Sequence, residues 1–380
     1  MQESNRKLKV GLVLDASLDN TDGVQQYVLD LGSWLSKQGH DVHYLVGESK
    51  RSDIKNLHSL SRNIKVKFNG NRTTMPLPVK NKKIEQLLNN QKFDVLHVQV
   101  PYSPFLAHKL IKLAPKDTVI IGTFHIVAYS SLVNVANRLL GFWLRKSLKK
   151  FNLMLSTSSA SLKYAKKYYG INSEVMPCAI DYQLFNKAER LSKYTNDKIN
   201  ILFLGRLVPR KGCITLLKAM LVIKKESDIN KYRILICGDG PLKEKIISFI
   251  NSSSLESNVE MVGFVDEDLK ANYYASADIS VFPSSGGESF GIVLLEAMAS
   301  GRSVVLAGDN PGYKTVLESR PELLFDALNY KELAKKIMYF SENKMESNKL
   351  REWEKNFTSK FDVSVVGTKI ENIYYRLIFH

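Results

Sequence analysis

The residues best suited to ligand binding or catalysis are concentrated in the stretch 284–301, which reads SSGGESFGIVLLEAMASG. Its glycines form a loop without side-chain bulk, so that backbone N–H groups can approach a ligand closely. From about Phe290 the apolar spacing becomes helical, and the unpaired N–H groups of a helix N-terminus favour phosphate. Glu288 and Glu296 add two carboxylates, which repel phosphate and therefore more readily accept hydrogen bonds from hydroxyl groups. The stretch predicts a site for a nucleotide-linked sugar.

A second constellation, FLGRLVPRKG at 203–212, is an apolar strand that runs into a basic glycine loop. Arg206 can hold a phosphate in a bidentate fork, and Lys211 can add a point charge. A third is His125, at the end of the strand 118–124, and a fourth is the helix start Gly23-Val24-Gln25. Simpler interpretations exist. The stretch 284–301 could be a common glycine turn with Glu296 as a solvated helix residue, 203–212 could be a basic turn, and His125 could be a structural histidine.

Composition sets outer limits on the class of protein. The chain has 380 residues, 44% hydrophobic and 24% charged, which is enough for two or three globular domains. The three cysteines are scattered without metal-ligand spacing, as in a reducing compartment. The sequence shows neither a signal peptide nor about 20 uninterrupted apolar residues. We therefore expect a cytoplasmic protein that is soluble or peripheral to a membrane.

The formal net charge of +16 could reflect binding to nucleic acid, to an anionic membrane or to anionic small molecules, or only a lysine-rich codon bias with a solvated surface. Nucleic acid is disfavoured because no aromatic-basic strand motif, zinc motif or helix-turn-helix pattern is present. Two basic clusters lie in the N-terminal half, one formed by Lys80, Lys82 and Lys83 and the other by the amphipathic helix 138–151. Either could meet anionic lipid, although 138–151 could equally be a core helix with a solvated basic face.

Strand and helix patterns alternate along the chain, which is typical of parallel α/β sheets. A polar segment at 186–198 separates two such series. We expect a Rossmann-like domain over 1–185 and another over 186–360, facing a cleft, with ligands at the carboxyl ends of the strands. The expected strands are 7–14, 41–46, 64–68, 93–99, 118–124, 153–157, 199–204, 232–237, 259–262, 279–282 and 303–306. The expected helices are 24–38, 84–88, one ending at 113, 134–150, 159–168, 214–225, 243–250, 267–276, one from about 290, and 363–377.

Two of these motifs carry a family resemblance. The pair Glu288 and Glu296 within GGESFGIVLLEAMASG resembles the E-x7-E signature of retaining glycosyltransferases of family 4, which have the GT-B fold, and FLGRLVPRKG resembles their diphosphate clamp. The resemblance implies that Glu296 binds the ribose, that Glu288 lies beside the donor sugar, and that a C-terminal helix, 361–380, packs back on the first domain. It implies catalytic roles for His125, Glu288, Arg206 and Lys211. It implies donor contacts for Gly23, Arg206, Lys211, Gly287, Glu288, Phe290, Gly291, Ile292 and Glu296.

Within the family, GVQ at 23–25 with the downstream FDVLH and TFH is most similar to the bacterial phosphatidylinositol mannosyltransferases. That similarity implies acceptor contacts for Gln25 and Asn69 and a membrane patch of Lys80, Lys82 and Lys83. The chain departs from the pattern after FDVLH, where it has Val-Gln-Val-Pro, and after TFH, where it has Ile-Val-Ala-Tyr. The donor side therefore matches better than the acceptor side.

The expected activity is retaining transfer of a hexose, mannose from GDP-mannose, to a lipid such as phosphatidylinositol at the inner face of the cell membrane. Fixed cations replace a metal in this expectation, and no cofactor and no nucleic-acid partner are predicted. A UDP-sugar donor, a saccharide acceptor or a sugar-nucleotide epimerase remain alternatives. The oligomeric state is open.

Overall fold

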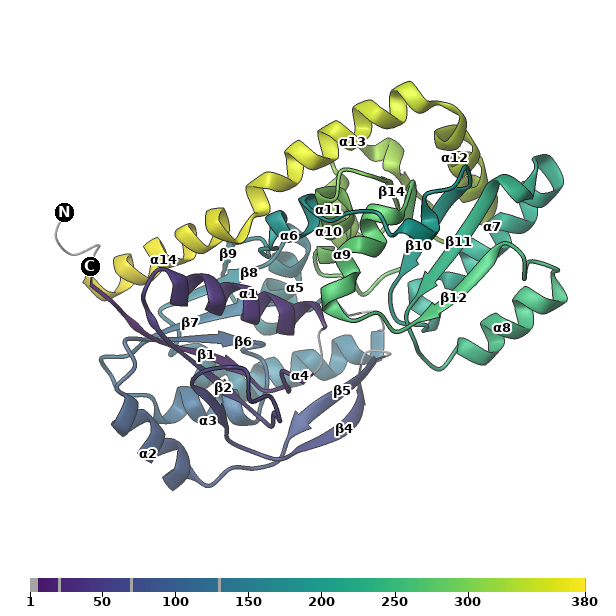
Figure 1. Ribbon diagram of the computed structural model, residues 1–380. Coiled ribbons are helices and arrows are strands. Elements are labelled where there is room, and N and C mark those ends of the chain that lie inside the picture. Colours follow the sequence, from purple (N-terminus) through teal and green to yellow (C-terminus); the bar gives the residue numbers. More distant parts are fainter. Residues whose placement is uncertain (1–5, 20–21, 69–70, 129–130, 380) are drawn as a thin grey trace. The chain divides into compact units, whose positions relative to one another are not determined.

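The computed structural model describes residues 6–19, 22–68, 71–128 and 131–379. The chain forms two compact units, Met1–Ala179 with Val363–His380, and Ile180–Asp362 (Figure 1). The second unit begins six residues before the expected boundary at 185/186. The backbone N–H of Ile180 donates to Phe361 O at 3.0 Å, which ties the start of this unit to its end.

A seven-stranded parallel sheet forms the first unit, in the order β3-β2-β1-β6-β7-β8-β9. The order reverses between β1 and β6, where doubly wound sheets bind ligands beyond the carboxyl ends of their strands. The strands are β1 (Lys9–Leu14), β2 (Asp41–Val46), β3 (Leu57–Ser59), β6 (Val95–Gln99), β7 (Val119–Phe124), β8 (Leu153–Ser156) and β9 (Glu174–Val175).

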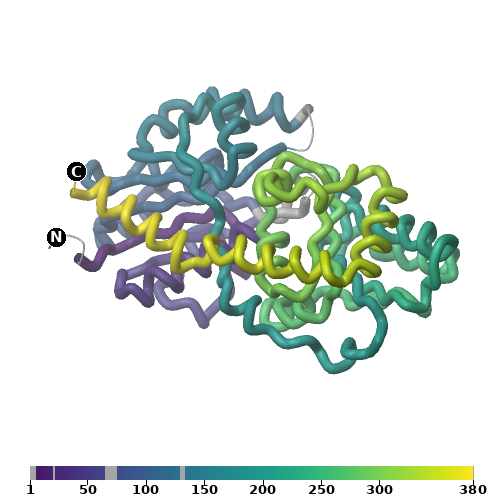
Figure 2. The backbone as a smooth tube through the Cα atoms, turned by 90° about the horizontal axis from the view of Figure 1, so that it is seen from above, coloured from purple at the N-terminus to yellow at the C-terminus, as the bar shows by residue number. Residues whose placement is uncertain are grey.

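Helices from both ends of the sequence cover this sheet. They are α1 (Gly23–Lys37), α2 (Asn81–Gln91), α3 (Leu106–Leu113), α4 (Ser131–Leu148), α5 (Ser159–Tyr169) and α14 (Val363–Phe379). In Figure 2 the yellow α14 lies along the purple and blue N-terminal part. Gly367 of α14 packs so closely on the Trp34 ring of α1 that an added Cβ would lie 2.5 Å from it. A larger residue at this position would push α14 away from α1.

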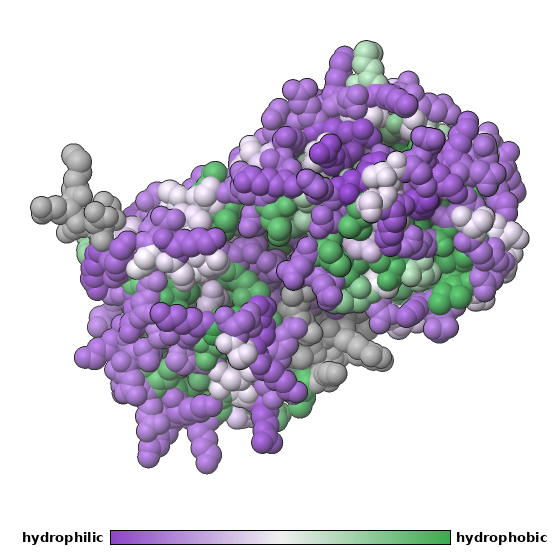
Figure 3. All heavy atoms as spheres, viewed as in Figure 1, coloured by the Kyte–Doolittle hydropathy of each residue, from purple (hydrophilic) through white to green (hydrophobic). Residues whose placement is uncertain are grey.

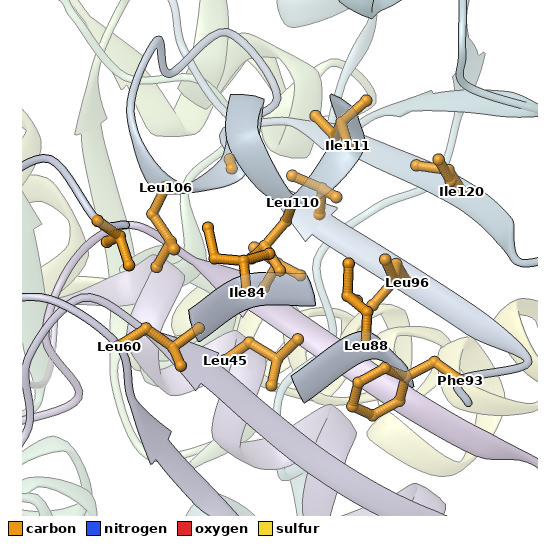
Figure 4. Close-up of a cluster of buried hydrophobic side chains, with 14 residues drawn as sticks. Leu45, Leu60, Ile84, Leu88, Phe93, Leu96, Leu106, Leu110, Ile111 and Ile120 are labelled. Atoms are coloured by element: carbon orange, nitrogen blue, oxygen red, sulfur yellow. The ribbon is translucent and has the colours of Figure 1, made fainter. Parts of the chain in front are cut away.

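A buried cluster under α2 and α3 fixes both helices to the sheet. Ile84 and Leu88 of α2 and Leu110 of α3 are fully or nearly fully buried, and Figure 4 shows them converging with Leu45 and Leu96 from the strands. The apolar face of α2 is therefore buried against the core, and its basic residues lie on the opposite, exposed side.

One expected element in this unit was incomplete. The sequence predicts a single strand over 64–68, whereas the structure has an antiparallel hairpin of β4 (Asn63–Phe68) and β5 (Asn71–Pro76) outside the main sheet. The polar sequence NRTTMP gives β5 no apolar alternation, and its pairing comes from β4 instead.

The second unit repeats the architecture with six parallel strands in the order β12-β11-β10-β13-β14-β15. The doubly wound α/β expectation is confirmed in both units. Here the strand order reverses between β10 and β13. The strands are β10 (Ile199–Leu204), β11 (Tyr232–Cys237), β12 (Val259–Gly263), β13 (Ile279–Phe282), β14 (Val304–Gly308) and β15 (Leu324–Phe325). The helices are α6 (Tyr182–Asn186), α7 (Cys213–Glu226), α8 (Lys243–Ser252), α9 (Glu267–Ser276), α10 (Ile292–Ala299), α11 (Pro311–Leu317), α12 (Tyr330–Glu342) and α13 (Lys344–Thr358).

The surface seen in Figure 3 is mostly hydrophilic, with groups of hydrophobic residues between the hydrophilic ones. Among the residues that the structure describes, no helix combines the length and the apolar character that a membrane span needs.

Candidate active site

Two loops meet at the carboxyl ends of β10 and β13, where the strand order of the second unit reverses. The first loop contains the 3-10 turn Pro209–Lys211 and ends at Gly212, and the second runs from Pro283 to α10. A Cβ on Gly212, whose φ is 73°, would lie 2.1 Å from the carbonyl oxygen of Pro283. Only glycine permits this approach, and the backbone N–H of Ser285 closes it by donating to Arg210 O at 2.9 Å.

The carboxylate of Glu288 lies at the centre of these loops. Its Oε1 accepts from Arg210 Nη1 at 2.6 Å and from Ser284 Oγ at 2.7 Å, and it pairs with Lys211 Nζ at 3.0 Å. The Arg210 side chain is only 7% exposed, so this ion pair is largely shielded from water. One carboxylate and two cations leave this group with a formal charge of +1.

Burial disfavours the ionised forms of Glu288 and Lys211, whereas the attraction between their opposite charges favours them. Burial alone would raise the pKa of Glu288, whereas Lys211 and Arg210 lower it to about 2, with help from Ser284. The pKa of Lys211 is lowered, first by burial and then by the charges of Arg210 and Arg206, although Glu288 opposes this shift. Glu288 is therefore ionised at neutral pH, and Arg206 is close enough to influence Lys211.

The glycine loop brings the remaining donor-side candidates to the start of α10. Gly287 and Gly291 have φ values of 73° and 130°, which side chains rarely tolerate. Gly291 is the N-cap of α10, and Ile292 is the first helical residue. Phe290 is buried and its ring packs edge-on against Phe361 at 5.8 Å, so its side chain anchors the loop in the core.

Glu296 lies inside α10 and is buried, contrary to the interpretation of a solvated helix residue. Its Oε1 accepts from Lys270 Nζ of α9 at 2.8 Å, and its Oε2 accepts from the hydroxyl of Tyr274 at 3.0 Å. Lys270 also pairs with Glu267 at 2.6 Å. Burial would lower the pKa of Lys270, but Glu296 and Glu267 together raise it. This second group has a formal charge of −1.

In the first unit, His125 follows β7 directly and is buried. Its Nε2 lies 2.7 Å from Gln99 Oε1 at the end of β6, and its ring meets the ring of Tyr27 edge-on at 5.6 Å. Burial lowers the pKa of His125 to about 3, so the imidazole is neutral at physiological pH. Behind it, His97 contacts Thr123 and Tyr374, each at 2.6 Å.

The other candidates of the first unit lie on α1 and α2. Gly23 begins α1 and is exposed, whereas Gln25 is buried in the same first turn, two residues before Tyr27. Asn69 lies outside the described residues. Lys80 is the N-cap of α2, and Lys82 and Lys83 are exposed in its first turn. Lys83 donates to the backbone oxygens of Ser59 and Leu60 at 3.2 and 3.1 Å.

Sequence reasoning missed the residues that hold the candidates in place. Arg210 lies in the same basic turn as Lys211, but nothing in the pattern PRKG tells which cation is buried. Lys270 pairs with Glu296 across 26 positions of sequence, and Gln99 contacts His125 in the same way. The sequence offered one signal, the polar residue Gln99 at the end of an apolar strand.

Comparison with known proteins identifies the family. Residues 21–184 match the profile described as Glycosyltransferase Family 4, and residues 186–358 match Glycosyl transferases group 1. The phosphatidyl-myo-inositol mannosyltransferase of Mycobacterium tuberculosis is 31% identical over 314 residues, 82% of this chain and 80% of the relative. The protein of the same name from Mycobacterium leprae is 28% identical over 97% of this chain and 96% of the relative.

Solved structures agree on the fold. A glycosyltransferase from Rickettsia africae superposes with a TM-score of 0.78 over 99% of this chain and 100% of the other, at 18% identity. HepE from Anabaena, crystallised with UDP and glucose, gives 0.72 over 96% and 99%, at 15% identity. With both domain profiles matched in order and two doubly wound units observed, the chain belongs to the GT-B glycosyltransferases of family 4 and is itself a glycosyltransferase.

Proposed function

We propose that this glycosyltransferase transfers mannose from GDP-mannose to phosphatidylinositol, with retention at the anomeric carbon, on the inner face of the cell membrane. Support for the sugar and the acceptor comes from relatives named phosphatidyl-myo-inositol mannosyltransferase, which align with most of the chain. The donor half of the proposal rests on one observation, the charge group around Glu288 at the switch point of the second sheet.

In this proposal Arg206 and Lys211 bind the diphosphate. The bond between the anomeric carbon and the diphosphate oxygen breaks, and negative charge accumulates on the leaving phosphate. Fixed cations that are already partly dehydrated stabilise this charge without reorganisation. They take the place that a metal ion occupies in other transferases, so we propose transfer without a metal or a cofactor.

The two carboxylates, Glu288 and Glu296, accept hydrogen bonds from hydroxyl groups of the donor in this proposal. Arg210 offsets the charge of Glu288, so that this carboxylate can lie near a diphosphate and accept a hydrogen bond from the sugar. Glu296 accepts hydrogen bonds from the ribose hydroxyl groups, while Lys270 and Tyr274 hold its carboxylate in position. The backbone around Gly287, Gly291 and Ile292 completes the donor site with N–H groups at the start of α10.

The first unit supplies the acceptor side. His125 is held neutral, so we assign it to positioning the sugar near the reacting carbon rather than to removing a proton. Gln25 contacts the inositol ring in this scheme, and Gly23 at the start of α1 contacts the donor beside the reacting carbon. The expected contact of Asn69 is part of the same proposal.

Release of nucleoside diphosphate tests the whole scheme. GDP-mannose is offered with and without vesicles that contain phosphatidylinositol, next to a UDP-glucose control. Release that needs both GDP-mannose and the inositol lipid supports the proposal. Release from UDP-glucose, the donor type bound in the Anabaena structures, or release that is independent of lipid, refutes the proposed substrates.

A further inference from the structure

The strongest unexplained feature of the first unit is the outer face of α4 (Ser131–Leu148). Four large apolar side chains on this helix are exposed: Val135 by 62%, Leu139 by 69%, Phe142 by 78% and Trp143 by 62%. Their spacing of four, three and one positions places them on one side of a helix with 3.6 residues per turn. We call these four residues the α4 stripe.

Other residues of α4 make the contacts that attach this helix to the protein interior. Leu144 is buried, Asn137 donates to the hydroxyl of Tyr164 at 2.8 Å, and Ser147 contacts His108 at 2.8 Å. Leu144 and the polar groups of Asn137 and Ser147 thus face the protein, while the four residues of the stripe face outward. Exposed apolar groups of this size usually mark an interaction surface.

Charge indicates what covers the stripe. Residues 118–173 contain eight Lys and Arg and no Asp or Glu, although the chain as a whole has 38 acidic residues. Arg138, Arg145, Lys146 and Lys149 are exposed on or directly after α4, interleaved with the stripe. An apolar stripe among basic residues with no acid fits an anionic lipid surface, which offers hydrocarbon below and phosphate above.

We propose that the α4 stripe is the membrane-docking surface of this enzyme, inserting Phe142 and Trp143 below the headgroups of an anionic bilayer while the basic residues bind lipid phosphate. The proposal deepens the function given above and rests on its lipid acceptor. It assigns a lesser part to Lys80, Lys82 and Lys83, because the apolar side chains of α2 are buried and Lys83 is already bonded to two carbonyl groups.

Trp143 is a natural probe for this docking. Its ring stacks on His108 at 5.4 Å but remains mostly exposed, whereas Trp34 is buried. Vesicles of phosphatidylcholine with phosphatidylglycerol are added to the full chain, without donor. We expect the emission of the parent, relative to a Trp143→Phe variant, to shift to shorter wavelength, and vesicles of phosphatidylcholine alone to give a much weaker response.

Sedimentation with the same vesicles measures the affinity. The double variant Phe142→Ser/Trp143→Ser should lower the partition coefficient by at least about tenfold, since each side chain loses its transfer into hydrocarbon. The variant Phe264→Ser is the matched control, because Phe264 is 70% exposed in the second unit. Replacing Lys80, Lys82 and Lys83 by Ser should have a smaller effect that disappears at high salt.

Several results would overturn the proposal. The proposal fails if the double variant partitions like the parent or if the Trp143 emission does not shift. It also fails if the lysine variant loses more of the partition coefficient than the double variant does. A parent dimer that the double variant converts to monomer would assign the stripe to a second copy. Release assays with phosphatidylinositol in detergent separate the two proposals, because there the double variant should react like the parent. If the parent binds vesicles but releases nothing in either format, docking stands and the proposed substrates fail.

Discussion

Replacing Arg210 tests whether the buried charge group organises the donor loops. Its guanidinium pairs with Glu288 at 2.6 Å, and its carbonyl oxygen accepts from the backbone N–H of Ser285. Arg210→Met keeps most of the buried apolar volume, leaves the backbone bond intact and removes one charge. Lys211 must then serve Glu288 alone, so that the formal charge of the group falls from +1 to zero.

The pKa of Glu288 sets the size of the effect. Its partners lower this pKa from 4.5 to about 2 despite burial, which corresponds to roughly 3 kcal/mol of net stabilisation of the carboxylate. Complete loss of a buried partner costs about 3–5 kcal/mol. Because Lys211 and Ser284 remain, we expect a smaller loss of about 2 kcal/mol in the free energy of unfolding, and about tenfold or more in diphosphate release.

Urea unfolding of the parent, Arg210→Met, Glu288→Gln and the double variant forms a thermodynamic cycle, with exposed Arg302→Met as control. We expect a coupling energy of at least about 1 kcal/mol. Stabilisation of a carboxylate with a lowered pKa is complete above pH 4.5 and is lost as the pH falls toward 2, so the gap between parent and variant should narrow over that range. Additivity within about 0.5 kcal/mol at pH 7 would refute the reasoning.

Two further predictions concern other buried groups. Lys270→Met should leave Glu296 buried with Tyr274 as its remaining partner, which should lower the free energy of unfolding by about 3 kcal/mol. It should also weaken nucleotide binding measured by calorimetry. Unchanged affinity would show that Glu296 does not contact the donor. Burial lowers the pKa values of His97 and His125 to about 3, so the stability of the first unit should be complete above pH 6.5 and decline as the pH falls. Between pH 7.5 and 5.5 each of these histidines should lower the free energy of unfolding by about 1–1.5 kcal/mol. A urea unfolding midpoint that stays constant over this pH range would contradict the prediction.

Much of the second unit could be predicted from the sequence. The expected ranges 199–204, 232–237, 267–276 and 279–282 coincide with β10, β11, α9 and β13. These strands are apolar runs between polar or glycine-rich turns, which is the signal of a buried parallel strand. The loop positions of Arg206, Lys211 and Glu288 followed, because parallel strands deliver their carboxyl ends to one edge.

Contacts between distant residues could not be predicted in the same way. The pairing of Lys270 with Glu296 depends on how α9 packs beside α10, and no local pattern carries that information. On α4 both sides carry large apolar side chains, because Leu144 is buried beside Asn137 and Ser147 while Phe142 and Trp143 face outward. A periodicity argument detects the inward-packed row Leu140, Leu144 and Leu148, but it does not show that a second apolar row stays exposed.

The membership of α14 in the first unit has a consequence for biosynthesis. Glu371 pairs with His40, Tyr374 contacts His97, and Gly367 packs on Trp34, so this unit lacks part of its core until the last helix is made. The ribosome must first synthesise all of residues 180–362, which takes roughly 10–40 seconds at about 5–20 residues per second. During that interval the second unit can fold to completion, while the earlier-made sheet leaves the α14-facing side of α1 uncovered and open to chaperones.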